Sequence, residues 1–406
     1  MRQLIFNIRQ LFGIRPATCL RVCGSGMADA FSLDDAWLVT NDGFIEAFGQ
    51  KETFPDGESF DETIDARGGM VMPAFCDSHT HIVYAGHREG EWVDKIRGLS
   101  YAEVARRGGG ILNSADLLHR TSEDELYRQA MERAREIAAK GTGGVEIKSG
   151  YGLNTRDELK MLRVIRRIAE DAPLRVVATF LGAHAVSREY AGRQGDYVDM
   201  LVDEMLPEVG REKLADYVDV FCDEGFFTPA EMDRILEAAA KYGLRPKVHV
   251  DELAPIGGLK VAVDRTALSV DHLESMREAD IPLLKESPTM PTLLPGTSFF
   301  SNMPYAPARR MIDGGLGVAL ASDYNPGSTP SGDMRFVMSL ACMKMRLLPE
   351  EALNAVTVNG AYAMGLSAEY GSVSVGRRAR LIITKPMPSL AFMPYAYTTD
   401  CISRVL

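Results

Sequence analysis

Short apolar runs alternate with amphipathic stretches from about residue 71 to residue 321 of this chain. Several of the runs are apolar at consecutive positions, which is the pattern of parallel strands that are covered on both faces. We therefore predict eight strands, at residues 71–77, 144–148, 174–181, 217–222, 246–250, 267–270, 289–294 and 317–321.

The stretches between these runs have the features of helices. Apolar residues recur with helical spacing, for example at Leu159, Leu162 and Ile165. Three stretches open with a capping-box pair, namely Ser122 with Glu125, Thr155 with Glu158, and Thr228 with Glu231. Eight alternating strand and helix units predict an α/β fold, a (β/α)8 TIM-type barrel, in which the chemistry lies at the carboxyl ends of the strands.

The two ends of the chain do not follow this rhythm. Residues 18–22, 36–49 and 372–385 are patterned as short strands and hairpins, and Asp42-Gly43 is a strong turn dipeptide. We expect both chain ends to form one small β-sandwich domain. The predicted division is 1–68 for the N-terminal part of that domain, 69–368 for the barrel, and 369–406 for the C-terminal part.

Composition narrows the class of protein. Of the 406 residues, 46% are apolar and 25% are charged, which is ordinary for a globular chain. The net charge of -11 argues against a nucleic-acid surface. No segment approaches the ~18 apolar residues of a membrane span, and the N-terminus lacks the continuous apolar core of a signal peptide. The six cysteines are scattered without a CxxC pair. We therefore expect a cytoplasmic protein that binds neither nucleic acid nor membranes.

Histidines gather where the barrel would have its mouth. Five of the seven lie at predicted strand ends: His79, His81, His184, His249 and His272. In an extended segment His79 and His81 point to the same face, so both imidazoles can reach one point. Alone, such a pair can be two polar residues of a loop. Because strand ends converge at the barrel mouth, the five together indicate a functional site.

Four of the residues at strand ends suit a divalent metal ion; they are His79, His81, His249 and Asp323. Three imidazoles and a carboxylate can hold an ion with a water molecule, whose pKa then falls to about 7. Asp323 is the candidate general base, and His272 can polarise the bond under attack or stabilise an oxyanion. The alternative for Asp323 is a cap or turn residue before Asn325.

Whether the site holds one metal ion or two depends on whether a strand provides a residue that can bridge two ions. A second metal would normally need a bridging carboxylated lysine or a glutamate from the fourth strand. The fourth predicted strand ends without a lysine, and Lys148 lies on the second. We therefore expect one ion.

Longer motifs surround these residues: HTHIVYAGHREGEW (79–92), RGGGILNSA (107–115), VEIKSGYGL (145–153), TFLGAHAV (179–186), FCDEGFF (221–227), HVDELAPIGG (249–258), SVDHLE (269–274) and ASDYNPGS (321–328). With the candidate ligands, they resemble the amidohydrolase superfamily and, within it, the imidazolonepropionase family. The resemblance runs from about residue 60 to beyond residue 365. The phrases GGGI, KSGYGL and LGAHAV are far more specific than two histidines.

The resemblance implies an activity and a set of roles. The activity is hydrolytic ring opening of 4-imidazolone-5-propanoate to N-formimidoyl-L-glutamate in L-histidine degradation, by a metal-activated water. One zinc or iron ion per subunit and a homodimer are implied. The family's metal ligands match His79, His81, His249 and Asp323, and its substrate-binding positions match Arg88, Tyr151, His184, Glu252, Asn325 and Gly327.

The residue types suit that substrate. A propionate tail calls for a guanidinium such as that of Arg88, and Tyr151 can donate to the same carboxylate. Tyr101 is a further substrate-binding candidate, with helix packing as its alternative. Glu252 can hydrogen-bond a ring N–H and shuttle a proton, or else pair with a surface cation, and His184 contacts the ring or its carbonyl. The candidate catalytic residues are Asp323, His272 and Glu252.

Two segments depart from the family pattern. Ser328 stands where the family has a threonine, which keeps a hydroxyl, and we include it among the substrate-binding candidates. Residues 376–381 lack the Ala-Asp-Leu common to the superfamily, which concerns the small domain. The competing interpretations are another mononuclear amidohydrolase, such as a purine or pyrimidine deaminase, and a non-catalytic scaffold.

Overall fold

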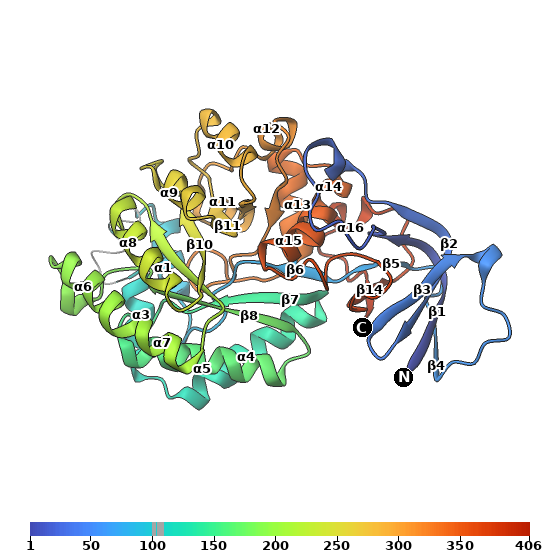
Figure 1. Ribbon diagram of the computed structural model, residues 1–406, viewed down its shortest axis with the longest axis horizontal. Coiled ribbons are helices and arrows are strands. Elements are labelled where there is room, and N and C mark those ends of the chain that lie inside the picture. The colour runs from blue at the N-terminus through green and yellow to red at the C-terminus, as the bar shows by residue number, and fades with distance from the viewer. Residues whose placement is uncertain (100–102, 104–108) are drawn as a thin grey trace.

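Eight parallel strands form a nearly closed barrel, and a second sheet lies beside it (Figure 1). The computed structural model describes residues 1–99, 103 and 109–406. The barrel strands are neighbours in chain order: β6 (Phe75–Asp77), β7 (Thr142–Lys148), β8 (Arg175–Ala183), β9 (Tyr217–Cys222), β10 (Arg245–Val250), β11 (Ser269–His272), β12 (Met290–Leu293) and β13 (Ala319–Leu320). The predicted barrel of alternating strands and helices is confirmed.

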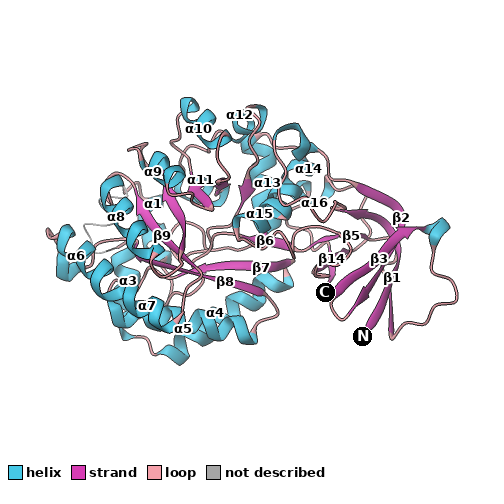
Figure 2. Ribbon diagram, in the orientation of Figure 1, coloured by secondary structure: helices cyan, strands magenta, loops and turns pink. Residues whose placement is uncertain are grey.

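Helices surround the barrel on its outer side (Figure 2). They are α1 (Glu89–Ile96), α3 (Ile111–Arg120), α4 (Glu123–Ala139), α5 (Thr155–Asp171), α6 (Gln194–Met200), α7 (Leu206–Glu212), α8 (Pro229–Ala240), α9 (Gly258–Asp264), α10 (Ile281–Lys285), α11 (Pro295–Ser301), α12 (Ala308–Asp313), α13 (Met334–Met345), α14 (Pro349–Val356), α15 (Val358–Ala363) and α16 (Phe392–Tyr395). The apolar stripe of α5 is buried at Leu159, Leu162 and Ile165.

The helix starts follow the predicted caps at two of three places. Thr228 caps α8 in a reciprocal capping box, and the Ser122 side chain accepts from the amide of the third residue of α4. The prediction for Thr155 was wrong, because Asn154 is the N-cap of α5. Glu158 turns instead toward the loop before the helix, where its carboxylate accepts three backbone N–H groups.

The predicted strand at 71–77 is two strands. β5 (Met70–Pro73) pairs with the second sheet, and β6 begins the barrel. Ala74 marks the change: its amide bonds Arg380 O on the second sheet, whereas the amide of Phe75 bonds Gly141 O at the start of β7. One continuous apolar run conceals this break because both parts are buried: Met70 and Met72 share one core with Phe75, and only Val71 packs in the core of the second sheet.

The barrel closes between its first and last strands through side chains and loop backbone. Ser322 donates its amide and its hydroxyl to the Asp77 carboxylate, at 2.9 and 2.6 Å. The Asp323 amide then donates to His79 O at 3.0 Å. The seam therefore draws together two segments, far apart in sequence, that carry candidate metal ligands.

The second sheet is assembled from both chain ends, as expected, and both termini lie beside it in Figure 1. Its strand order is β15-β14-β5-β1-β2-β3, with β4 paired to β1. Besides β5, the strands are β1 (Arg2–Phe12), β2 (Ser32–Asn41), β3 (Phe44–Gln50), β4 (Glu62–Asp65), β14 (Leu381–Thr384) and β15 (Ile402–Val405). Asp42 and Gly43 both have positive φ in the turn between β2 and β3.

Residues 18–22 do not form the predicted strand. The Val22 backbone pairs with the Asn359 side chain, which accepts from its amide at 2.9 Å and donates to its carbonyl at 3.0 Å. A side chain thus takes the bonds that a neighbouring strand would take. The division of the chain at residues 68 and 368 stays a prediction.

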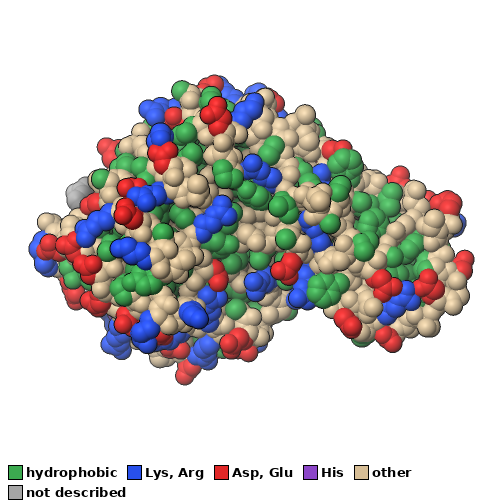
Figure 3. Space-filling model, in the orientation of Figure 1, with side chains coloured by type: hydrophobic (Ala, Val, Ile, Leu, Met, Phe, Trp, Pro, Cys, Tyr) green, Lys and Arg blue, Asp and Glu red, His purple; other side chains and the backbone are tan. Residues whose placement is uncertain are grey.

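The surface mixes charges of both signs. Figure 3 shows acidic and basic side chains interspersed over the face in view, and exposed ion pairs such as Arg128 with Glu125 join some of them. Among the described residues, no helix combines the length and apolar character needed to cross a membrane.

Candidate active site

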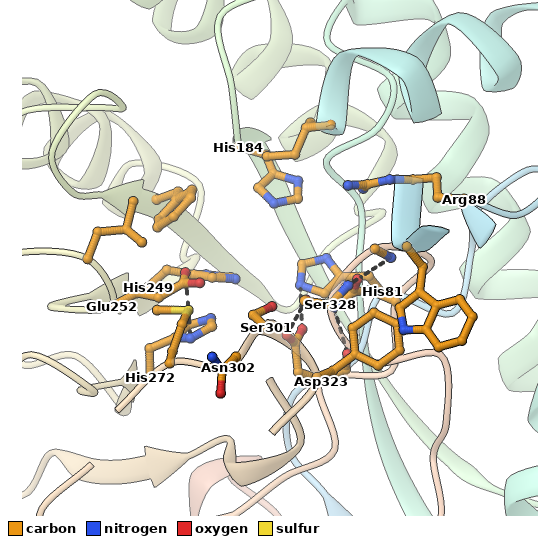
Figure 4. Close-up of a pocket in the computed structure, with 18 of the residues that line it drawn as sticks. His81, Arg88, His184, His249, Glu252, His272, Ser301, Asn302, Asp323 and Ser328 are labelled. Atoms are coloured by element: carbon orange, nitrogen blue, oxygen red, sulfur yellow. Dashed lines mark hydrogen bonds and ion pairs between the residues drawn. The ribbon is translucent and has the colours of Figure 1, made fainter. Parts of the chain in front are cut away.

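A cavity of about 580 Å³ opens at the carboxyl ends of the barrel strands. Figure 4 shows Glu252 and His272 on one side of it and Arg88 on the other. Most of the predicted site residues line it: His81, Arg88, Tyr151, His184, His249, Glu252, His272, Asp323, Asn325, Gly327 and Ser328. The fold thus brings together side chains that are far apart in the sequence, from His81 to Ser328.

His79, His81 and His249 form a compact cluster at this cavity. One ring nitrogen from each lies within 4.8 Å of the other two, and all three side chains are buried. The Nε2 atoms of His79 and His81 are 3.2 Å apart. Asp323 Oδ1 lies 3.6 Å from the first of these atoms and 3.5 Å from the second. Three imidazole nitrogens therefore lie together, and one oxygen of Asp323 lies beside two of them.

The protonation of these histidines fits a metal ion. Burial, reinforced by neighbouring cations, holds the pKa of His79, His81 and His249 well below its usual range. Neutral imidazole is the form that binds metal. His79 Nδ1 lies 2.7 Å from Asp271 Oδ2, and an imidazole that donates there keeps the Nε2 lone pair for an ion.

Asp323 is fixed by hydroxyl groups and by its backbone. Thr297 Oγ1 donates to its Oδ2 at 2.6 Å, and Ser328 Oγ donates to the same oxygen at 3.2 Å. The other oxygen is the one that faces the histidines. Asp323 has a φ of 53°, a conformation that costs energy outside glycine and gathers at functional sites. Burial raises its pKa.

His272 lies between two carboxylates. Its Nδ1 is 3.6 Å from Glu252 Oε2 and 3.4 Å from Glu274 Oε2. Burial opposes the charge of the imidazole, but the two carboxylates outweigh it and raise the pKa of His272 to about 10. Burial raises the pKa of Glu252 to about 7, against the effect of His272. His272 is the last residue of β11, which begins two residues later than we predicted.

His184 and Tyr151 form a wall of the cavity. The imidazole of His184 stacks on that of His81, with centroids 5.2 Å apart and planes 13° apart. Its Nδ1 bonds Gly150 O at 3.0 Å, and burial lowers its pKa to about 4. The loop that carries Tyr151 is held by Glu158, whose buried carboxylate accepts three amides of residues 150–153.

Arg88 lies just before α1 and is anchored by that helix. Glu91 Oε2 accepts from Arg88 Nε at 2.9 Å. The Glu91 carboxylate also accepts from the Gly110 amide and from Asn113 Nδ2. The guanidinium lies against Gly327, where an added Cβ would meet Arg88 Cζ at 2.4 Å. A side chain at position 327 would therefore displace the guanidinium.

The segment 325–328 forms a tight turn at the cavity edge. Asn325 Oδ1 accepts the amides of Gly327 and Ser328, both at 2.8 Å, and its Nδ2 donates to Ser328 Oγ at 2.7 Å. The turn directs Ser328 toward Asp323 and keeps Gly327 against Arg88. Tyr101 lies outside the described residues.

Three kinds of residue at this site were not predicted from the sequence. The aromatic walls include Phe221 near the end of β9, Phe226 in the loop that follows and Phe300 in α11; the first two lie in the motif FCDEGFF, but no role was predicted for them. Glu91 was read only as part of a motif. Asp219, 2.9 Å from His249 Nδ1, left a signal that we did not use, since a charged residue within an apolar strand must face the barrel interior.

Comparison with known proteins gives both a family and close relatives. The model of the amidohydrolase family matches residues 102–391. The imidazolonepropionase of Flavobacterium psychrophilum is 52% identical over 405 residues, covering 100% of this chain and 98% of the relative. The imidazolonepropionase of Symbiobacterium thermophilum is 45% identical over 392 residues, covering 94% and 91%.

Solved structures match the fold at low sequence identity. Atrazine chlorohydrolase from Arthrobacter aurescens, complexed with zinc and atraton, has a TM-score of 0.73 at 16% identity, with 100% of this chain and 93% of that chain covered. 5-Methylcytosine deaminase from Klebsiella pneumoniae has a TM-score of 0.74 at 16% identity, with 99% and 96% covered. These likenesses establish the barrel with its second sheet.

Proposed function

This chain belongs to the amidohydrolase family and, within it, to the imidazolonepropionases, and on that premise we propose that it hydrolyses 4-imidazolone-5-propanoate to N-formimidoyl-L-glutamate. The reaction is a step of L-histidine degradation and breaks a cyclic amide C–N bond. The structural observation that carries the proposal is one cavity that is lined both by His81 and His249 of the histidine cluster and by the guanidinium of Arg88.

His79, His81, His249 and Asp323 would hold the metal ion. When bound, a divalent ion supplies a water molecule that ionises near neutral pH. The chain contributes the arrangement of the ligands: three neutral imidazoles, and a carboxylate whose second oxygen is held by Thr297. Asp271 fixes the ring of His79 from behind.

Hydrolysis requires one proton to leave a water molecule and one to reach the departing ring nitrogen. The water oxygen bonds to the ring carbonyl carbon, and the C–N bond then breaks. We assign acceptance of the first proton to Asp323, which faces the cluster. We assign protonation of the nitrogen to Glu252, whose pKa of about 7 allows it to gain and lose a proton near neutrality.

His272 stabilises the charge that develops on the carbonyl oxygen. Its raised pKa keeps the imidazole protonated, so it can donate to an oxyanion throughout the reaction. Glu252 and Glu274 hold that charge in place from the other side of the ring.

The remaining residues position the substrate. Arg88 pairs with the propionate carboxylate, and Tyr151 adds a hydrogen bond to it. His184 contacts the ring. Asn325, Gly327 and Ser328 shape the turn that faces the substrate.

Three finer properties are part of the proposal. The ion is zinc or iron, because imidazole-rich sites suit both, and the matched atrazine chlorohydrolase structure contains zinc. The protein acts as a homodimer, which the family resemblance supports and sedimentation equilibrium would test. It acts in the cytoplasm, which is supported by six cysteines scattered without a disulfide pattern.

Metal analysis of the purified protein, combined with an assay on freshly prepared 4-imidazolone-5-propanoate, tests the proposed function. We expect one ion per subunit, loss of the ultraviolet absorbance of the substrate, and N-formimidoyl-L-glutamate without free ammonia. Immediate release of ammonia would identify a deaminase instead. Absence of turnover with the metal-loaded protein would favour a non-catalytic scaffold.

A further inference from the structure

Five ionisable side chains lie inside the barrel, beneath the histidine cluster. They are Glu146 and Lys148 on β7, Asp219 on β9, Lys247 on β10 and Asp271 on β11, and their side chains are 0% exposed. Burying a charge is costly unless oppositely charged partners and hydrogen bonds surround it. The two lysines and three carboxylates therefore form a buried network of charges. Because such a network is costly to bury, we expect it to have a role at this site.

Lys148 lies at the centre of this network. Its Nζ donates to Glu146 Oε1 at 2.9 Å, to Asp219 Oδ2 at 2.8 Å and to Asp271 Oδ2 at 3.5 Å. Three carboxylates around one nitrogen require the ammonium form, which excludes a carboxylated lysine that would bridge two metal ions. Lys148 therefore does not bind a metal ion itself, and any role that it has at the metal site must act through the carboxylates around it.

Two of these carboxylates also contact the candidate metal ligands. Asp271 Oδ2 is 2.7 Å from His79 Nδ1, and Asp219 Oδ2 is 2.9 Å from His249 Nδ1. The second contact does not have hydrogen-bond geometry, but Asp219 Oδ1 also accepts the His249 amide at 3.1 Å. In both carboxylates, the oxygen that faces the histidine is also the one that faces Lys148.

We propose that Lys148 is a positioning residue that fixes the imidazoles of His79 and His249 together, through Asp271 and Asp219, and so sets the affinity of the site for its ion. This inference rests on the metal site in the proposed function. Carboxylates behind a ligating histidine orient its ring and fix its tautomer. One ammonium shared by two such carboxylates links ligands that come from the first and the fifth barrel strands.

Removal of Lys148 would leave Asp219 and Asp271 close together without the cation between them. Both carboxylates lie within 3.5 Å of Lys148 Nζ, and without that cation their mutual repulsion favours rotation of one of them away from its histidine. Such a rotation weakens the hold on that histidine. Simple removal of a positive charge near the ion would act in the opposite direction and tighten metal binding. The direction of the change in affinity therefore distinguishes positioning from a plain charge effect.

Lys247 offers a matched control. It is buried to the same extent in the same barrel, and its Nζ lies 2.8 Å from Glu146 Oε2. Its other partners are the carbonyl oxygens of Ser78 and Ala363. Neither aspartate behind a histidine is among these contacts, although the charge of Lys247 acts on Asp219 at longer range. Substitution of Lys247 therefore removes a buried charge of the same sign without removing a hydrogen bond to the carboxylates that contact the candidate ligands.

The experiment measures zinc affinity of the metal-free protein by competition with a chelator, for the wild type, Lys148→Met and Lys247→Met. We expect Lys148→Met to bind zinc about 10- to 100-fold more weakly, the range typical for loss of a group behind a metal ligand. Lys247→Met should stay within about threefold of the wild type, although both variants should melt at lower temperatures. Equal affinities in the two variants, or tighter binding in Lys148→Met, would overturn the inference.

Asp271→Asn and Asp219→Asn keep the test decisive if Lys148→Met does not fold. Each retains the shape of the side chain but loses the charge that Lys148 contacts, and each should weaken zinc binding by about 10-fold or more. Wild-type affinity in both would overturn the inference. Because the readout is metal binding, it does not depend on the identity of the substrate. Failure of the wild type to bind zinc would instead remove the metal site itself and this inference with it.

Discussion

The cavity has two parts that are built differently. The strand part comprises His79, His81, His249, His272 and Asp323, which lie at or just beyond the ends of barrel strands and are nearly inaccessible to solvent. The loop part comprises Arg88, Trp92, Phe300 and the turn 325–328, which come from loops and short helices, together with Glu91, which contacts Arg88. Trp92 is 45% exposed, whereas the strand part is at most 3% exposed.

We infer from this difference that the strand part carries out the reaction and that the loop part recognises the substrate. In the strand part, burial lowers the pKa of His79, His81 and His249, whereas two carboxylates raise that of His272. A backbone hydrogen bond from Asp323 to His79 across the barrel seam joins two of the candidate ligands. In the loop part, the Glu91 carboxylate accepts hydrogen bonds both from the guanidinium of Arg88 and from the amide of Gly110, and so links the two. We therefore expect substitutions in the strand part to act on kcat and those in the loop part to act on KM.

Asp323→Ala should lower kcat more than any other substitution considered in the strand part. It removes a metal ligand and the assigned proton acceptor, so kcat should fall by about 10³-fold or more. Steady-state assays with zinc in excess, together with metal analysis, measure the effect. Activity near that of the wild type would exclude the proposed role of Asp323.

His272→Ala should retain the metal but lose stabilisation of the oxyanion. We expect kcat to fall by roughly 10²- to 10³-fold with little change in KM, because the interaction strengthens in the transition state. Zinc content serves as the control and should match that of the wild type. A rise in KM at constant kcat would assign His272 to substrate binding instead.

Arg88→Ala should have the largest effect among residues of the loop part. Loss of hydrogen bonds to a charged partner is worth about 1.5–3 kcal/mol, so KM should rise roughly 10- to 100-fold. Arg88→Lys should recover only part of this loss, because an ammonium cannot make a bidentate contact. A fall in kcat without a change in KM would place Arg88 in the reaction rather than in recognition.

Glu91→Ala should raise KM, as Arg88→Ala does, but by a smaller factor. It frees the guanidinium at Nε and the amide of Gly110, and a hydrogen bond worth about 1 kcal/mol predicts a severalfold rise in KM. Glu89→Ala on the same helix is the matched control, since Glu89 is exposed. Equal KM values in both variants would show that Glu91 does not position Arg88.

The two parts also differ in how far the sequence could predict them. Histidines and Asp323 at strand ends stand out because polar residues interrupt apolar runs at a regular period, and parallel strands bring their ends together. The same reasoning predicted the barrel. It did not divide residues 71–77 between two sheets, because burial in either core favours the same apolar residues.

Contacts of the loop part could not be derived in the same way. Glu91 reaches Gly110 and Asn113 through tertiary structure, and only its spacing of three residues from Arg88 gives a local indication of a partner. Arg88 itself was assigned from a resemblance and from the charge of the substrate. Glu158 gave a misleading local signal, because three loop amides competed successfully for its carboxylate.

The most direct test of this division compares kcat/KM for 4-imidazolone-5-propanoate and for its propionamide analogue, in the wild type and in Arg88→Ala. The wild type should prefer the carboxylate substrate by roughly 10- to 100-fold, in line with one charged hydrogen-bonded pair. Arg88→Ala should turn over both compounds at similar, low efficiency, because the strand part remains intact. A preference for the carboxylate that survives in Arg88→Ala would contradict the account.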